Sequence, residues 1–216
     1  MVAASDALGD DTGTRVHAWL AEDERPLTHR IDADWTRRAD TGNAWSIGYV
    51  PRRHFGRRAY GFAETRLGGE AALGIDTEAR ALVGVGATLS PAPAARLFAE
   101  IGAGVVRTDL DDPCEDARTV APGAPCFGAP AVEAETSGLG TLRAGASATL
   151  AERVGLSAAA GVEAREGATD LGASATASLA APGGTASVTL RTRRLSRDGE
   201  DARSVTDTFV GYSLGF

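Results

Sequence analysis

The chain has 216 residues, 43% of them hydrophobic, and a formal net charge of −7, which allows one sizeable domain or a medium-sized barrel. Apart from three histidines its basic residues are all arginine, and an acidic chain without a basic block is a poor candidate for binding a nucleic-acid backbone. The most apolar window, 139–156, is interrupted by Arg143, Glu152 and Arg153, so the sequence predicts no transmembrane helix of about 20 apolar residues.

Strict alternation of apolar residues with small or polar ones recurs along most of the chain and predicts β-strands. In the segment 75–89, for example, Val83 and Val85 share one face, while Arg80 and Gly84 share the other. Nothing between the alternating segments is typical of a crossover helix, which indicates antiparallel neighbours. The sequence predicts about eleven such segments, at 13–22, 27–38, 43–51, 57–67, 75–89, 95–108, 137–150, 153–165, 169–181, 185–196 and 205–216.

Most of these segments are long enough to cross a bilayer as a tilted strand of about 9–11 residues. Alternation alone fits two architectures, because a soluble ligand-binding barrel buries its apolar face and a membrane barrel turns it to lipid. Three features favour the membrane: a polar face of Gly, Ser, Thr, Arg and Glu, connections that alternate in length, and a last strand that ends in Phe216. We therefore expect an all-β, antiparallel transmembrane β-barrel in the outer membrane of a Gram-negative-type bacterium.

The lengths of the connections predict which ends of the strands face outward, since outer-membrane barrels have short periplasmic turns and longer outer loops. With Phe216 on the periplasmic side, the polar link 197–204 and the longest loop, 109–136, both fall on the outer side. The tight links 182–184 and 90–94 fall on the periplasmic side. The pattern of lengths therefore agrees with a membrane barrel along this half of the chain.

The beginning of the sequence disagrees with that picture. Residues 1–13 contain neither the basic nor the apolar segment of a secretory signal, which alone favours a cytoplasmic protein. Bacterial single-chain barrels have even strand numbers, whereas eleven segments are visible. We therefore expect that a signal peptide and a first strand are missing upstream of Met1, and that the full-length barrel has twelve strands. Residues 13–216 then form the barrel, and residues 1–12 are an outer loop or the remnant of the missing strand.

The last strand resembles the signal by which the barrel-assembly machinery recognises its clients. Its apolar face carries aromatic and aliphatic residues at alternate positions: Val210, Tyr212, Leu214 and Phe216. The alternative is an ordinary final strand that happens to end in Phe. The expected partners are therefore outer-membrane lipid and the barrel-assembly machinery, with no nucleic acid.

Two parts of the chain carry a family resemblance. The run YGFAETR at 60–66, followed by residues 76–86, resembles the middle of the salt-induced outer-membrane protein family. The endings TDT at 206–208 and GYSLGF at 211–216 are similar to the pattern with which its members close. The resemblance covers nearly the whole chain, although its motifs are strand and turn patterns. It implies a barrel of about twelve strands and supplies no catalytic residue.

Two cysteines, Cys114 and Cys126, lie in the longest loop. Exported proteins meet an oxidising environment, so these cysteines are predicted to form a disulfide, which contributes on the order of 3 kcal/mol in the chain-entropy model. Metal binding is the alternative, but the loop contains no His and lacks Cys-x₂-Cys spacing. The sequence predicts neither a metal site nor a cofactor.

A catalytic barrel would need a nucleophile, a base and an orienting group on neighbouring strands. His17 is the one candidate base, with Ser46 or Ser213 in range only by accident. Packing in the lumen or at the membrane interface is favoured for the histidines, with His29 and Trp35 at interfacial aromatic positions. No catalytic residue is predicted. The three histidines are His17, His29 and His54.

Charged residues recur on the polar face of the strands and are predicted to point into the lumen. They either pair into a plug of salt bridges that stabilises a narrow barrel, or line a passage for small ions or solutes. Their mixed signs favour the plug, because selective pores usually carry one dominant sign. The predicted lumen charges are Arg30, Asp32, Asp34, Glu78, Arg80, Glu100, Arg143, Glu163, Arg165, Arg191 and Arg193.

The sequence thus favours a structural or weakly conducting outer-membrane barrel without catalytic activity. A soluble ligand-binding barrel and an outer-membrane enzyme are the alternatives. Because a fold does not determine a function, the sequence names no solute, no oligomeric state and no inducing condition.

Overall fold

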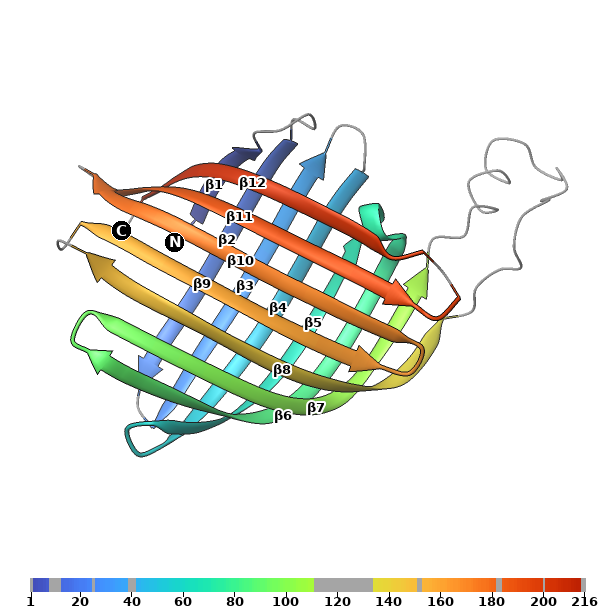
Figure 1. Cartoon of the computed structure of the whole chain (residues 1–216), viewed down its shortest axis with the longest axis horizontal. Helices are drawn as coiled ribbons and strands as arrows, with labels where there is room; N and C mark the ends of the chain where they lie inside the picture. The colour runs from blue at the N-terminus through green and yellow to red at the C-terminus, as the bar shows by residue number, and fades with distance from the viewer. Residues whose placement is uncertain are drawn as a thin grey trace, which may run out of the picture.

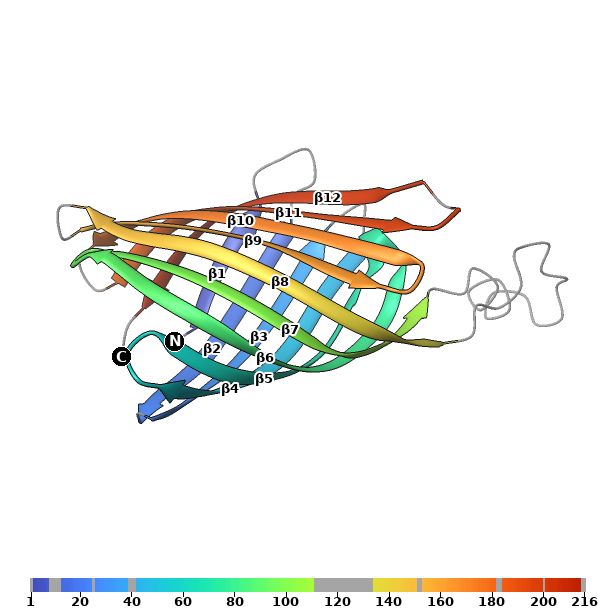
Figure 2. The ribbon, with the colours of Figure 1, turned by 60° about the horizontal axis from the view of Figure 1, so that its bottom comes forward.

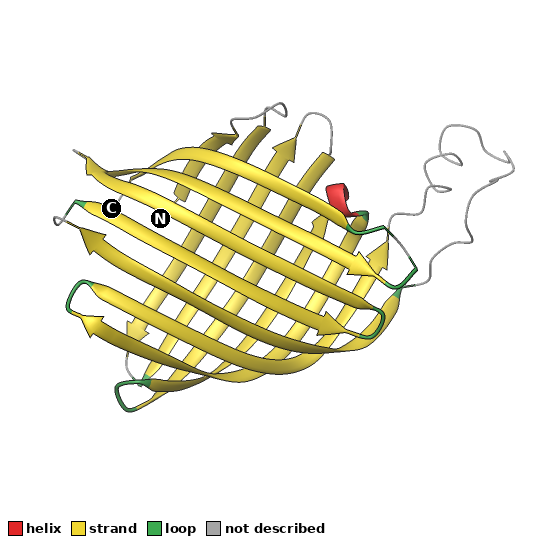
Figure 3. Cartoon of the chain, in the orientation of Figure 1, coloured by secondary structure: helices red, strands yellow, loops and turns green. Residues whose placement is uncertain are grey.

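A computed structural model describes residues 2–7, 13–24, 26–38, 42–110, 134–150, 153–181, 184–199 and 201–214. Within these residues, twelve antiparallel strands form one closed barrel, in which each strand pairs with its neighbours in the chain and β1 pairs with β12 (Figure 1). The strands cross the barrel at a tilt, and one short helical turn lies at one end (Figure 3). The predicted fold class, an antiparallel barrel, is confirmed.

Each of the eleven predicted segments corresponds to one strand, with ends that differ by at most four residues. The strands β2 to β12 therefore follow the alternation that the sequence displays. The elements are β1 (Val2–Ala7), β2 (Gly13–Glu24), β3 (Leu27–Arg38), β4 (Gly42–Phe55), β5 (Ala59–Glu70), η1 (Ala71–Leu73), β6 (Ile75–Ala92), β7 (Ala95–Leu110), β8 (Glu135–Leu150), β9 (Val154–Arg165), β10 (Ala168–Ala181), β11 (Gly184–Arg197) and β12 (Arg203–Leu214).

The structure corrects the strand count at the beginning of the chain. Residues 2–7, expected to be an outer loop or a remnant, form β1, which pairs with β2 from Ala7↔Gly13 onward and with β12 through Ala3↔Ser213. The strand that closes the barrel therefore lies within this sequence. Sequence analysis overlooked β1 because six residues rich in alanine show too little contrast between their two faces.

The apolar face of the alternation points away from the barrel interior. Val83 is 66% exposed, Val85 59% and Ile101 60%, although all three lie in the middle of long strands. Burial of apolar area is the main force that stabilises proteins in water, so a wide apolar exterior indicates that lipid surrounds this one. The soluble ligand-binding barrel, which would bury this face, is therefore wrong.

Ring-bearing side chains lie on the outer surface near both ends of β3. Trp35 of β3 pairs in register with Trp45 of β4, and both rings are exposed. His29 stacks on the ring of Tyr49, and its Nδ1 atom lies 2.7 Å from the Tyr49 hydroxyl. These positions are typical of the aromatic girdles of membrane barrels, as predicted for His29 and Trp35.

The connections fall into two sets at opposite ends of the barrel. We call the end where β1 begins and β12 ends the termini end, and the opposite end the loop end (Figures 1 and 2). The links between β4 and β5, between β6 and β7 and between β10 and β11 lie at the termini end. Strand β7 ends and strand β8 begins at the loop end. This arrangement matches the alternation of connection lengths in the sequence. No helix in the described residues has the length and apolar character needed to span a bilayer.

Aromatic side chains on the inner face pack over glycines of the neighbouring strand. Tyr60 lies opposite Gly86 and Phe62 lies opposite Gly84 in the β5–β6 register. A Cβ atom at Gly86 would lie 2.6 Å from Tyr60 Cε2, and one at Gly84 would lie 2.6 Å from Phe62 Cζ. The missing Cβ atoms therefore make room for rings that fill the narrow interior.

The variant Gly86→Ala should lower the free energy of unfolding by about 1–3 kcal/mol, because overpacking forces the Tyr60 ring out of its position. Urea titration of the barrel in lipid vesicles measures this change. The variant Gly172→Ala is the matched control, because a Cβ atom at Gly172 meets nothing within 4 Å. Equal losses for the two variants would contradict the packing argument.

Candidate functional site in the barrel lumen

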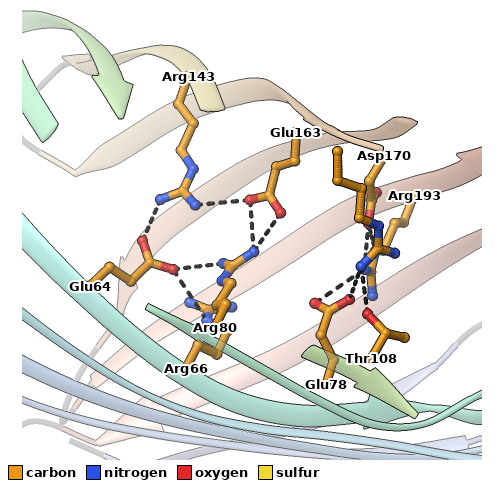
Figure 4. Close-up of polar contacts among 10 residues, drawn as sticks. Glu64, Arg66, Glu78, Arg80, Thr108, Arg143, Glu163, Asp170 and Arg193 are labelled. Atoms are coloured by element: carbon orange, nitrogen blue, oxygen red, sulfur yellow. Dashed lines mark hydrogen bonds and ion pairs between the residues drawn. The ribbon is translucent and has the colours of Figure 1, made fainter. Parts of the chain in front are cut away.

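Four charged side chains from four strands meet at the centre of the lumen. Glu64 of β5, only 2% exposed, binds Arg80 of β6 at 2.6 Å and Arg143 of β8 at 2.5 Å. Glu163 of β9 binds the same two guanidinium groups, at 2.6 Å to Arg80 and 2.9 Å to Arg143 (Figure 4). Each carboxylate therefore contacts both arginines. We call these four residues the central ion-pair cluster.

Further charges extend the central cluster toward β3. Arg66, on the same face of β5 as Glu64, lies 3.7 Å from Glu64 and 3.3 Å from Asp32 of β3. Arg30 in turn lies 3.6 Å from Asp32, and its side chain is half exposed. The cluster therefore links strands from β3 to β9 through alternating signs.

A second group of ion pairs spans the interior between β6 and β11. Glu78 of β6 lies 3.2 Å from Arg165 of β9 and 3.9 Å from Arg193 of β11. Arg193 Nε also donates to Asp170 at 2.8 Å (Figure 4). Arg165 donates to the Thr108 hydroxyl at 2.6 Å. Because β6 and β11 lie five strands apart around the wall, these contacts cross the lumen.

Side chains also cross the lumen at the loop end. Arg38 of β3 binds Glu70 of β5 at 2.6 Å and Asp207 of β12 through two nitrogen atoms, at 2.7 and 2.8 Å. Beside them, Leu73 of η1 and Ile75 of β6 pack on Leu195 of β11, and all three are almost fully buried. The segment between β5 and β6 therefore packs across the interior rather than projecting away from it. We call these residues the loop-end closure.

Toward the termini end, one carboxylate accepts hydrogen bonds from two side chains. Glu100 of β7 accepts a hydrogen bond from Tyr60 at 2.7 Å and from Arg52 of β4 at 3.0 Å. The Arg52 guanidinium lies 5.4 Å from the centre of the Tyr60 ring, within cation–π range. Glu100 is 5% exposed, so both of its neighbours compensate a buried charge.

A cavity of about 410 Å³ runs beside these clusters. Its lining among the described residues contains equal numbers of carboxylates and arginines, so the fixed charges balance. A balanced lining with no dominant sign lacks the charge ring typical of ion-selective pores. The carboxylates are Asp34, Glu70, Glu78, Glu100, Glu163 and Asp170, and the arginines are Arg52, Arg66, Arg80, Arg143, Arg191 and Arg193.

Most of the predicted lumen charges lie in these clusters, and Arg191 lines the cavity beside them. Sequence analysis missed the residue with most contacts, Glu64, together with Arg66. The reason lies in β5, where Tyr60 and Phe62 share the inner face with these charges, so the strand has no polar face to recognise. It also missed five charges that a strict count of alternate positions would have indicated: Arg38, Arg52, Glu70, Asp170 and Asp207.

His17 and Ser46 do not assemble a catalytic group, and the side chain of the other candidate nucleophile, Ser213, lies outside the described residues. His17 Nδ1 lies 3.2 Å from Asp34, and Ser46 pairs with Asp34 on the next strand. The carboxylate therefore stands between the candidate base and the candidate nucleophile, whereas a hydrolase triad needs the base beside the nucleophile. His54 packs on the Tyr60 ring. No group of three potential metal ligands occurs in the described part of the chain.

A closed antiparallel barrel with an apolar exterior and a charged interior is the architecture of outer-membrane β-barrel proteins. Within that class, the chain belongs to the family described as "Protein of unknown function, DUF481", which matches residues 12–212. Among curated proteins, no sequence matches this one.

Several solved structures share the fold. The "KdgM porin in complex with disordered oligogalacturonate" has a TM-score of 0.57 at 9% identity, with 100% of this chain and 98% of that chain covered. The NanC porin has a TM-score of 0.59 at 7% identity, with both chains fully covered. At such identities the likeness shows the fold alone.

Three predicted residues lie outside the described part of the chain, Cys114, Cys126 and Phe216, and so does the side chain of Leu214. The predicted disulfide therefore stays a prediction. In the predicted assembly signal, Val210 and Tyr212 lie on the outer face of β12, and both are 42% exposed.

Proposed function

We propose that this protein is a narrow, weakly conducting outer-membrane channel whose central ion-pair cluster is the constriction. The observation that carries the proposal is the position of Glu64, Arg80, Arg143 and Glu163, which bind one another in the lumen from four strands. Their side chains occupy space through which a solute would have to pass. No catalytic activity is part of the proposal.

Two properties of the lumen support passage of small ions only. The cavity of about 410 Å³ holds water and small ions, while the ion pairs that cross from β6 to β11 divide it. The balanced charges of this cavity favour neither cations nor anions strongly, because its arginines and carboxylates are equal in number. A charged constriction of this kind excludes large solutes without sealing the lumen to water.

Planar-bilayer recording tests this proposal directly. Wild-type protein should give small conductance steps, and the variant Arg143→Gln with Glu163→Gln should raise the unit conductance several-fold. The paired substitution leaves the net charge unchanged, so the widened constriction is the cause of the increase. Heat-modifiable migration in detergent first confirms that each preparation is folded.

The matched control is Ser174→Ala, a change in the same cavity at a side chain that is not part of the cluster. This control should conduct like the wild-type protein. Complete absence of steps from folded wild-type protein would overturn the channel. Identical conductance of the wild-type protein and the paired variant would overturn the constriction.

Three finer predictions belong to this proposal. The family resemblance supports induction by salt, the alternating last strand supports recognition by the barrel-assembly machinery, and the export of a barrel supports the disulfide between Cys114 and Cys126. Each extends the outer-membrane assignment and rests on the sequence.

A further inference from the structure

A second cavity, of about 510 Å³, opens at the termini end of the barrel. Three arginines line it, Arg57, Arg58 and Arg96, together with His54 and the ring of Tyr60. The hydroxyl-bearing residues Thr88 and Ser90 complete the lining. Positive charge is thus concentrated here in a chain whose net charge is −7.

The fold brings these residues together from four strands. His54 pairs with Tyr60 across the hairpin of β4 and β5, whose turn carries Arg57 and Arg58. The Thr88 amide donates to the Arg58 carbonyl at 2.7 Å, which ties this turn to β6.

Arg96 belongs to the lumen face of β7. That strand turns Phe98 and Glu100 inward at alternate positions, and Arg96 continues the series at the termini end. The cavity is therefore the mouth of the lumen.

No carboxylate lines this cavity among the described residues. Glu100, the acidic residue that contacts Tyr60, is already bound to Arg52 and is nearly buried. The side chains of Arg57, Arg58 and Arg96 form no ion pair with any carboxylate in the described part of the chain. The mouth therefore differs from the rest of the lumen, where arginines and carboxylates alternate.

We propose that this mouth binds a multivalent oxyanion, such as a phosphate or dicarboxylate group. Guanidinium groups match the oxygens of phosphate and carboxylate through paired N–H donors. A concave wall with charges of one sign concentrates counter-ions. The Ser90 hydroxyl supplies a neutral donor beside the charges. The site is separate from the constriction, and its occupation does not require that ions pass through the barrel.

Isothermal titration of the folded barrel with inorganic pyrophosphate, in a zwitterionic detergent at low salt, tests the proposal. Wild-type protein should bind, and the triple variant Arg57→Gln, Arg58→Gln and Arg96→Gln should bind at least tenfold more weakly. Raising the ionic strength should weaken wild-type binding, because the arginines are exposed to solvent. Heat-modifiable migration shows whether the triple variant is folded.

The matched control removes three arginines from the outer surface toward the loop end, Arg37, Arg107 and Arg194, each replaced by Gln. This control should bind pyrophosphate like the wild-type protein. Equal losses in both triple variants would show that overall charge is responsible and would overturn the site. Failure of folded wild-type protein to bind would overturn it as well.

The same titration in nanodiscs distinguishes a soluble anion from a lipid headgroup. If pyrophosphate binds equally in phosphatidylcholine and in phosphatidylglycerol nanodiscs, the site takes a soluble anion. If phosphatidylglycerol suppresses binding in the wild-type protein, its headgroup phosphate occupies the same arginines. Either result supports the oxyanion site and identifies its source.

Discussion

Replacing Glu64 by Ala should lower the free energy of unfolding by about 3–5 kcal/mol, because the change leaves buried positive charge without compensation. Glu64 is 2% exposed and contacts Arg80 and Arg143, with Arg66 close by. Glu163 remains near two of these arginines. In the variant, however, this single carboxylate has to balance the positive charge that two carboxylates balance in the wild-type protein. Urea titration in lipid vesicles, followed by tryptophan fluorescence, measures the loss.

Two further variants show whether the loss comes from the ion pairs. Glu135→Ala removes an exposed carboxylate at the loop end of β8 and should change the free energy of unfolding by less than about 1 kcal/mol. Removing Glu64 and Arg143 together should cost less than the sum of the single changes, since the two residues interact directly. A loss in Glu64→Ala no greater than in Glu135→Ala would contradict the central cluster.

A charge placed in the middle of the outer surface should also destabilise the barrel. Val83→Arg should lower the free energy of unfolding by about 2–4 kcal/mol, because Val83 lies at the centre of β6 and faces lipid. The same urea titration measures this loss of stability. Poor insertion of the refolded variant into vesicles would be a second sign of the same destabilisation.

The depth of the substitution provides the control. Leu150→Arg places the same side chain on the outer surface at the last residue of β8, where the guanidinium group reaches the interface. There the cost should be about 0–1 kcal/mol. Equal costs at the two positions would show that Val83 does not lie in the apolar part of a bilayer.

The strands, and the faces that they turn to lipid and to the lumen, were predictable from the sequence. The reason is that successive residues face lipid, which favours apolar side chains, and the lumen, which favours polar ones. In β6 the contrast between Val83 and Arg80 identifies both faces without any structure. The contrast fails at β1, whose six residues are mostly small. It fails again in β5, where Tyr60 and Phe62 lie on the inner face because glycines opposite them leave room for rings.

The partners of the lumen charges could not be predicted from alternation. A period of two assigns a side chain to a face, but it does not give the register and curvature that bring Glu64 to Arg143 across three strand pairings. Nor does it show that η1 packs across the loop end against β11. For the same reason, the gathering of Arg58 and Arg96 at one mouth appears only in the folded barrel.

The two ends of the lumen differ in their fixed charge. The loop end is narrowed by apolar side chains and by Arg38, whose charge Glu70 and Asp207 neutralise. The termini end is open and carries unbalanced arginines. If the barrel conducts ions as proposed, this asymmetry predicts rectification, because mobile anions accumulate at the charged end under one polarity of voltage and are depleted under the other. The asymmetric placement of arginines thus predicts ion currents that differ between the two polarities of voltage.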